Sequence, residues 1–211
     1  MILKISYLNF NRLETYLDVL IIVLFGENLP FKRFAGLSKE EILKGLKYRL
    51  ITYLTPYSKK ILYLRKMESK AETIAKNKQI SFPFRVRIIY EKGKSFVSIG
   101  FSYDYSKKTD GKFDIYIYST LVMAPEEDIL KTIFHEYGHF IYYHAPTKTL
   151  IPFGGLYFNN KFPKLTPTND FVEDFCELFA YLILDLRKVD DILLKQIETA
   201  RNEALLIMEK I

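Results

Sequence analysis

A chain of 211 residues with 49% hydrophobic residues can bury a sizeable core, which excludes wholesale disorder and fits one domain or a small catalytic domain with an added module. The single cysteine, Cys176, excludes an internal disulfide framework and a cysteine-rich zinc site. The net charge is +6, but the 31 basic residues are spread along the chain, so we expect no nucleic-acid partner.

The apolar run from Val19 to Phe25 is too short to span a membrane, and no small-residue cleavage site follows it. We therefore expect a buried helix there, no membrane contact, and a cytoplasmic protein. The composition has few Gln and many Lys, Glu, Ile and Tyr residues, which is typical of a thermophile or of an AT-rich genome.

Helical periodicity extends from residue 11 to about residue 79, with a capping box at residues 38–41. A helix is predicted to start near Ser58, and its apolar face carries Ile61, Leu64, Met67, Ala71 and Ile74. We assign residues 1–80 to a helical N-terminal region. Its role is open: it is a regulatory region, a pro-segment that covers a cleft, or a region with another role. Residues 81–211 form the predicted catalytic domain.

After Pro83 the hydrophobic period changes to two, which indicates β-strands. Three strands are predicted, at Arg85–Glu91, Val97–Tyr105 and Phe113–Ser119. Because short polar turns join them, we expect an antiparallel meander.

The next helix is predicted from about Ala124 to His144, with a proline at its first position and three acids in its first turn. It carries the string HEYGH at residues 135–139. Residues four apart share a helix face, so His135 and His139 can bind one metal ion with Glu136 beside it. With only 3 histidines in the chain, roughly 0.003 chance matches are expected.

A long loop is predicted at Ala145–Thr168, because prolines and glycines gather near its middle and ends. Thr168 or Asn169 would then cap a helix at about 170–187, and a final helix would cover about 189–210.

A catalytic zinc site uses three protein ligands and a water, so the two histidines need a third residue. Glu173 and Glu177 are four apart and share a stripe on an otherwise apolar helix. Asp170 and Asp174 rank lower, because one lies at the helix start and the other faces away from that stripe. His144 is predicted to be a helix C-terminal residue stabilised by the helix dipole.

HEYGH at 135–139, followed after 33 residues by ExxxExxA at 173–180, resembles the gluzincin metallopeptidases, which include the thermolysin type and the small minigluzincins. The resemblance covers about residues 84–187. It implies one zinc ion held by His135, His139 and Glu173.

In such enzymes the glutamate of the motif is the general base, which corresponds to Glu136 here. An acidic residue four positions after the third ligand supports the first histidine by a hydrogen bond. Glu177 occupies that position, where the family most often has Asp.

The resemblance also implies an α+β, zincin-like fold, with an antiparallel sheet of three or more strands packed on the motif helix and the glutamate helix. The strand Phe113–Ser119 would form the edge of the cleft, where an extended peptide binds. Gluzincins commonly add a Tyr or His that stabilises the oxyanion, and the candidates are His144, Tyr143 and Tyr157.

The function expected from these features is a zinc metalloendopeptidase that acts on peptide or protein substrates. Two alternatives stay open. One is a regulatory protease that cuts a single protein partner, and the other is a binding protein in which zinc only stabilises the fold.

Overall fold

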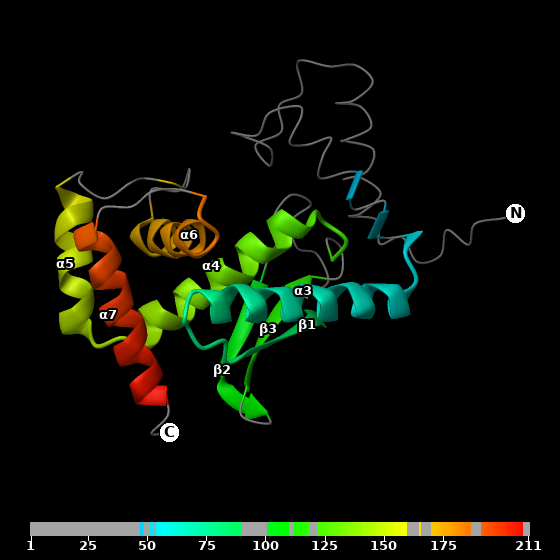
Figure 1. Ribbon diagram of the computed structural model, residues 1–211, viewed down its shortest axis with the longest axis horizontal. Helices are drawn as coiled ribbons and strands as arrows, with labels where there is room; N and C mark the ends of the chain where they lie inside the picture. The colour runs from blue at the N-terminus through cyan, green and yellow to red at the C-terminus, as the bar shows by residue number, and fades with distance from the viewer. Residues whose placement is uncertain are drawn as a thin grey trace, which may run out of the picture.

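The structure is a computed structural model that describes residues 47–48, 51–52, 54–89, 101–109, 112–118, 122–159, 165, 170–186 and 191–208. The apolar run at 19–25 and the capping box at 38–41 lie outside the described residues. The elements of this part, in chain order, are α3 (Tyr57–Asn77), β1 (Phe84–Ile89), β2 (Phe101–Thr109), β3 (Lys112–Tyr118), α4 (Glu126–His144), α5 (Thr147–Phe158), α6 (Phe171–Ile183) and α7 (Asp191–Met208) (Figure 1).

Helix α3 forms where the periodicity predicts it, directly after Pro56. Its buried residues recur at helical spacing: Leu64, Met67, Ala71 and Ala75. They belong to the same hydrophobic core as the sheet and α4. The Tyr63 hydroxyl also donates a hydrogen bond of 2.8 Å to the carbonyl of Ala124, just before α4. The end of the region assigned to residues 1–80 is thus built into the core.

The sheet has the strand order β1-β3-β2 and is mixed. Strand β1 lies parallel to β3, with Phe84 opposite Phe113, whereas β2 lies antiparallel to β3, with Tyr103 opposite Ile115. The prediction of an antiparallel sheet, and with it the α+β zincin-like fold class, is wrong: the described chain is mostly helical, and its small sheet contains a parallel pair. The short turns predict that each strand pairs with the next along the chain; β2 and β3 do pair in this way, but β1 pairs with β3 instead of with β2.

Strand β3 lies in the centre of the sheet, which also corrects the prediction that Phe113–Ser119 is the edge of the cleft. Phe113, Ile115 and Ile117 are almost wholly buried, as expected for a central strand. The edge strands of the described sheet are β1 and β2.

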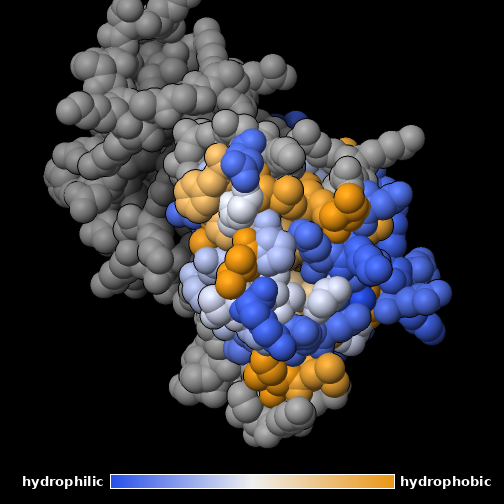
Figure 2. Space-filling view, turned by 90° about the vertical axis from the view of Figure 1, so that its left-hand side faces the viewer, coloured by the Kyte–Doolittle hydropathy of each residue, from blue (hydrophilic) through white to orange (hydrophobic). Residues whose placement is uncertain are grey.

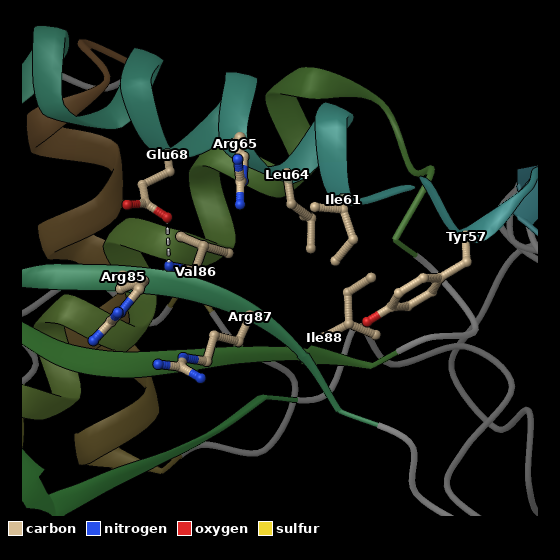
Figure 3. Close-up of a pocket in the computed structure, with 9 residues that line it drawn as sticks. All are labelled: Tyr57, Ile61, Leu64, Arg65, Glu68, Arg85, Val86, Arg87 and Ile88. Atoms are coloured by element: carbon tan, nitrogen blue, oxygen red, sulfur yellow. Dashed lines mark hydrogen bonds between the residues drawn. The ribbon is translucent and has the colours of Figure 1, made fainter. Parts of the chain in front are cut away.

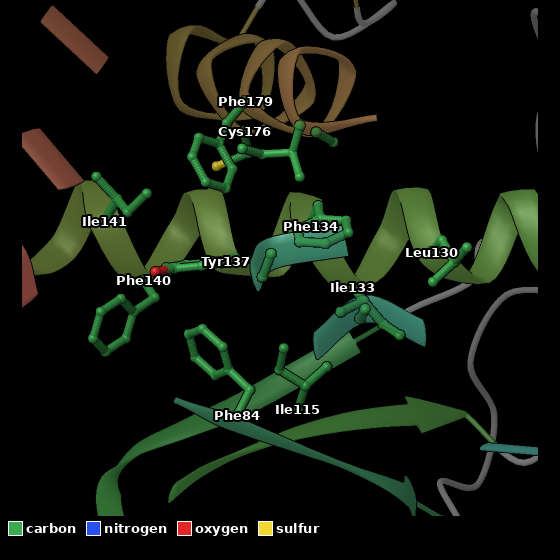
Figure 4. Close-up of a cluster of buried hydrophobic side chains, with 14 of the residues drawn as sticks. Phe84, Ile115, Leu130, Ile133, Phe134, Tyr137, Phe140, Ile141, Cys176 and Phe179 are labelled. Atoms are coloured by element: carbon green, nitrogen blue, oxygen red, sulfur yellow. The ribbon is translucent and has the colours of Figure 1, made fainter. Parts of the chain in front are cut away.

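Helix α4 lies between two layers, with the sheet on one side and α6 on the other (Figure 4). The predicted apolar side of this helix is confirmed, since Leu130, Ile133, Phe134, Tyr137 and Ile141 are all buried. The Tyr137 ring lies 4.7 Å from that of Phe84 and 5.2 Å from that of Phe179. Its hydroxyl donates to the carbonyl of Ser81 at 2.9 Å. Burial raises the pKa of Tyr137 to about 12, so this hydroxyl keeps its proton.

The ends of α4 follow the local sequence signals. Pro125 is the N-cap residue, and three acids occupy the first turn, where the helix dipole favours negative charge. Lys66 and Lys70 of α3 form ion pairs with Glu126, the first residue of α4. The helix ends at His144, before Pro146.

The prediction of a loop at Ala145–Thr168 is wrong for its first half, because residues 147–158 form helix α5 with Pro152 inside it. Its aromatic side chains pack on α6: the Phe153 ring lies 5.2 Å from that of Phe175, and the Tyr157 ring 5.2 Å from that of Phe171. Tertiary burial of these rings outweighs the helix-breaking residues.

Helix α6 begins after Asp170, whose side chain accepts hydrogen bonds from the backbone N–H groups of Val172 and Glu173 at 2.8 and 3.5 Å. Asp170 is therefore the N-cap, in place of the predicted Thr168 or Asn169, which lie outside the described residues. On the side with α5 and α7, hydrophobic and hydrophilic surface is interspersed (Figure 2). Ile151 and Phe158 of α5 are exposed apolar side chains. Within the described residues, no helix is long and apolar enough to cross a membrane.

A cavity of about 530 Å³ lies between α3 and the outer edge of β1 (Figure 3). Glu68 reaches across it and accepts a hydrogen bond of 2.9 Å from the backbone N–H of Val86. On the same strand, Arg85 and Arg87 form ion pairs with the buried carboxylate of Asp114, at 3.3 and 2.9 Å. One edge of the sheet is thus partly occupied by a side chain of α3.

Candidate metal centre

Two polar stripes face each other where α4 packs on α6. Both have a spacing of four residues, so each stripe lies on a single helix face. The stripe on α4 consists of Lys131, His135 and His139, and the stripe on α6 consists of Glu173, Glu177 and Tyr181. The two stripes run in opposite directions. Lys131, early in α4, contacts Glu177, whereas His135 and His139, later in α4, contact Glu173 near the start of α6.

The two imidazoles turn their Nε2 atoms toward the same carboxylate. His135 Nε2 lies 3.2 Å from Glu173 Oε2, and His139 Nε2 lies 3.5 Å from Glu173 Oε1. Both histidine side chains are mostly buried, whereas that of Glu173 is 41% exposed. Two nitrogens and a carboxylate therefore converge at a point that solvent reaches from the Glu173 side.

Glu177 supports His135 from behind. Its Oε2 accepts a hydrogen bond of 3.2 Å from His135 Nδ1, which leaves Nε2 directed at Glu173. Its other oxygen, Oε1, forms an ion pair with Lys131. Burial raises the pKa of Glu177, but the hydrogen bonds from His135 and Lys131 outweigh it, so the pKa is lowered overall. Glu177 is thus ionised.

Glu136 is buried, with 7% of its surface exposed. Burial raises its pKa, the charge of His135 lowers it and that of Glu173 raises it, and the result is a pKa of about 7. A carboxylate with a pKa near neutrality can both accept and release a proton under physiological conditions.

The histidines differ in protonation when no metal is bound. Burial lowers the pKa of His135, but the hydrogen bonds to Glu173 and Glu177 and the charge of Glu136 raise it more, to about 9. Burial and the charge of His135 together lower the pKa of His139 to about 4. His139 is therefore already a neutral donor, whereas His135 carries a proton that a metal ion must displace.

Gly138, inside the motif, lets the two helices approach closely. A Cβ atom at this position would lie 2.7 Å from the Cα of Cys176 on α6, which is closer than side chains can pack. The sequence predicts the two histidines of this motif but gives no signal that the residue between them must lack a side chain. The close approach brings Glu173 within reach of both Nε2 atoms.

The same approach brings a thiol close, since donor atoms of His135, His139 and Cys176 all lie within 4.8 Å of one another. Metals bind the thiolate, but burial and the charges of Glu136 and Glu173 raise the pKa of Cys176 well above 9. By contrast, the hydrogen bond from His135 lowers the pKa of Glu173, which is ionised. Glu173 is therefore the better third donor, and Cys176 packs as the small hydrophobic residue that the sequence predicts.

The three candidates for oxyanion stabilisation lie in different places. The Tyr143 ring, 60% exposed, stacks beside that of His139 with centroids 6.2 Å apart. His144 donates from Nδ1 to the carbonyl of Phe140 at 2.8 Å, at the end of α4. Tyr157 lies on α5; burial raises the pKa of its hydroxyl, and so does the neighbouring Asp174. Of the three, Tyr143 lies beside one of the two histidines.

Lys131 and Tyr181 were missed at the sequence level, although a signal for both was present. Lys131 lies one turn before His135, and Tyr181 lies one turn after Glu177. Extending each four-residue stripe by one step would have identified them.

In comparisons with known proteins, no family model matches the chain, and no curated protein or solved structure matches it.

Proposed function

We propose that the protein is a zinc-dependent metallopeptidase of the gluzincin type, which hydrolyses peptide bonds in peptide or protein substrates. The observation that carries this proposal is the convergence of His135 Nε2, His139 Nε2 and the Glu173 carboxylate, 3.2 and 3.5 Å apart, beside the buried Glu136. Two imidazoles and one carboxylate with an open side are the donor set of a catalytic zinc site.

In this proposal His135, His139 and Glu173 hold the ion. When bound, zinc acts as a Lewis acid that polarises a carbonyl and lowers the pKa of water. Glu136 would accept the proton of the attacking water and deliver it to the leaving amine. Glu177 keeps the His135 ring in place through Nδ1.

A catalytic role is favoured over a purely structural one by the packing around the site. Helices α4 and α6 are joined by wholly buried side chains, including Tyr137 of α4 and Phe179 of α6. Zinc that only stabilises a fold normally replaces a missing core. Here the core is present, and Glu173 is the most exposed of the three donors.

The first experiment is metal analysis of the purified wild type and Glu173→Ala. We expect one zinc per wild-type chain and a large loss in the variant. If the variant keeps full zinc occupancy, the assignment of Glu173 is wrong.

The second experiment measures cleavage of casein and of unfolded polypeptides by wild type and Glu136→Gln. We expect the variant to retain zinc and to lose cleavage, because the substitution removes the proton acceptor and leaves the three ligands in place. Cleavage at the wild-type rate would contradict the mechanism.

The same assays separate the alternatives. A regulatory protease would leave casein intact but would cut one co-purified protein partner in a zinc- and Glu136-dependent way. A zinc-stabilised binding protein would cut nothing, and removing its zinc would unfold it. We also propose that the protein works in the cytoplasm.

A further inference from the structure

Lys131 and Tyr181 extend the polar contact between α4 and α6 beyond the groups that would hold zinc. Lys131 Nζ forms an ion pair with Glu177 Oε1 and lies 3.3 Å from the Tyr181 hydroxyl. It also lies 4.8 Å from the centroid of the Tyr181 ring, within range of a cation–π interaction. The ammonium group is thus held between a carboxylate and an aromatic ring.

The two oxygens of Glu177 have separate partners. Oε1 binds Lys131, and Oε2 accepts the hydrogen bond from His135 Nδ1. Only 12% of the Glu177 side chain is exposed, so water can replace little of either contact. Rotation of the carboxylate would break both contacts at once, and Lys131 therefore opposes it.

We propose that Lys131 is a positioning residue for the metal centre: it holds Glu177 so that this carboxylate fixes the His135 ring with Nε2 toward Glu173. This inference rests on the proposed function. Partners of metal-ligating histidines set the ring orientation and the basicity of the ligand, and losing one typically weakens metal binding by 10- to 100-fold. Lys131 acts one step further out, through Glu177.

The other contribution of Lys131 is electrostatic. Without the ammonium group, Glu177 would be a mostly buried carboxylate that depends on His135 for its compensation. Leaving a buried charge with part of its compensation removed is strongly unfavourable, so the carboxylate would turn toward solvent. This rotation would weaken the hydrogen bond that orients the histidine.

The chain provides a matched control at the start of the same helix. Lys70 forms an ion pair with Glu126, the first residue of α4, and both side chains are more exposed than Glu177. Lys70→Met therefore removes a lysine–glutamate pair from α4 without touching the polar stripes. The zinc affinity of this variant shows how much the loss of a lysine–glutamate ion pair matters when the pair lies away from the metal centre.

The test is a double-mutant cycle in zinc affinity, measured by chelator competition on wild type, Lys131→Met, Glu177→Gln and the double variant. We expect Lys131→Met to weaken zinc about tenfold, Glu177→Gln by about 10- to 100-fold, and the double variant no more than Glu177→Gln alone. Lys70→Met should bind zinc like wild type. The visible spectrum of the cobalt-substituted protein should change in Lys131→Met and revert in Lys131→Arg.

Wild-type affinity in Lys131→Met beside weakened binding in Glu177→Gln would overturn the positioning role and leave the metal centre intact. Fully additive losses would also overturn it, because Lys131 would then act independently of Glu177. A wild type that binds no zinc would refute the proposed centre and this inference together. Should Lys131→Met not unfold cooperatively, Lys131→Gln, which keeps a polar end group, takes its place in the same cycle.

Discussion

Replacing Gly138 by alanine tests whether the close approach of α4 and α6 creates the site. The new Cβ would lie 2.7 Å from the Cα of Cys176, whereas carbon atoms pack at roughly 3.5–4.0 Å, so the helices must separate by about 0.8 Å or more. Overpacking of this kind costs about 1–3 kcal/mol, and the better helix propensity of alanine returns about 1 kcal/mol. We expect a net loss of up to about 2 kcal/mol in the free energy of unfolding.

The expected decrease in melting temperature is up to about 8 °C, measured on the metal-free protein by circular dichroism. Zinc affinity should also fall by at least about tenfold, because a shift of about 0.8 Å moves Glu173 away from the histidines. Cys176→Ala should not rescue the variant, since the nearest atom is backbone.

The matched control is Gly154→Ala in α5, where a Cβ would meet no heavy atom within 4 Å. This variant should be stabilised by up to about 1 kcal/mol and should bind zinc like wild type. If Gly138→Ala matches the control in both stability and zinc affinity, contact with Cys176 does not set the helix distance.

Three further predictions follow from the charges and the core. Zinc affinity should rise about tenfold per pH unit between pH 6.5 and 9, because zinc must displace the proton of His135, whose pKa is about 9; a flat profile in chelator competition would contradict this. The same proton stabilises the metal-free fold by at most about 3 kcal/mol below pH 6.5, and urea titrations should show that this contribution is lost as the pH rises through 9. A fragment of residues 81–211 should not unfold cooperatively on heating, since it lacks the core residues of α3, among them Leu64 and Met67; a folded, more active fragment would instead support a pro-segment.

The elements that carry the candidate site could be predicted because their signals are local. Pro125, the three acids and Pro146 bound α4 within the sequence, and the four-residue spacing of Glu173 and Glu177 is visible on one stripe of α6. The contact between Gly138 and Cys176 could not be predicted, since it depends on how two helices cross.

The errors arose where long-range contacts decide the structure. Strand β1 pairs in parallel with β3, and the turn signals between the strands contain no information about that pairing. Helix α5 forms despite Pro152 because Phe153 and Tyr157 pack on rings of α6. In both cases the deciding partner lies more than ten residues away in the sequence.

Helix α6 links the candidate site to the segment that precedes it. Next to Glu173 on the chain, the wholly buried Asp174 accepts a hydrogen bond of 2.8 Å from the backbone N–H of Leu165. The backbone at Leu165 is therefore tied to the turn of α6 that carries Glu173. A substitution at Asp174 would release that tie, although Asp174 itself is not one of the converging donors.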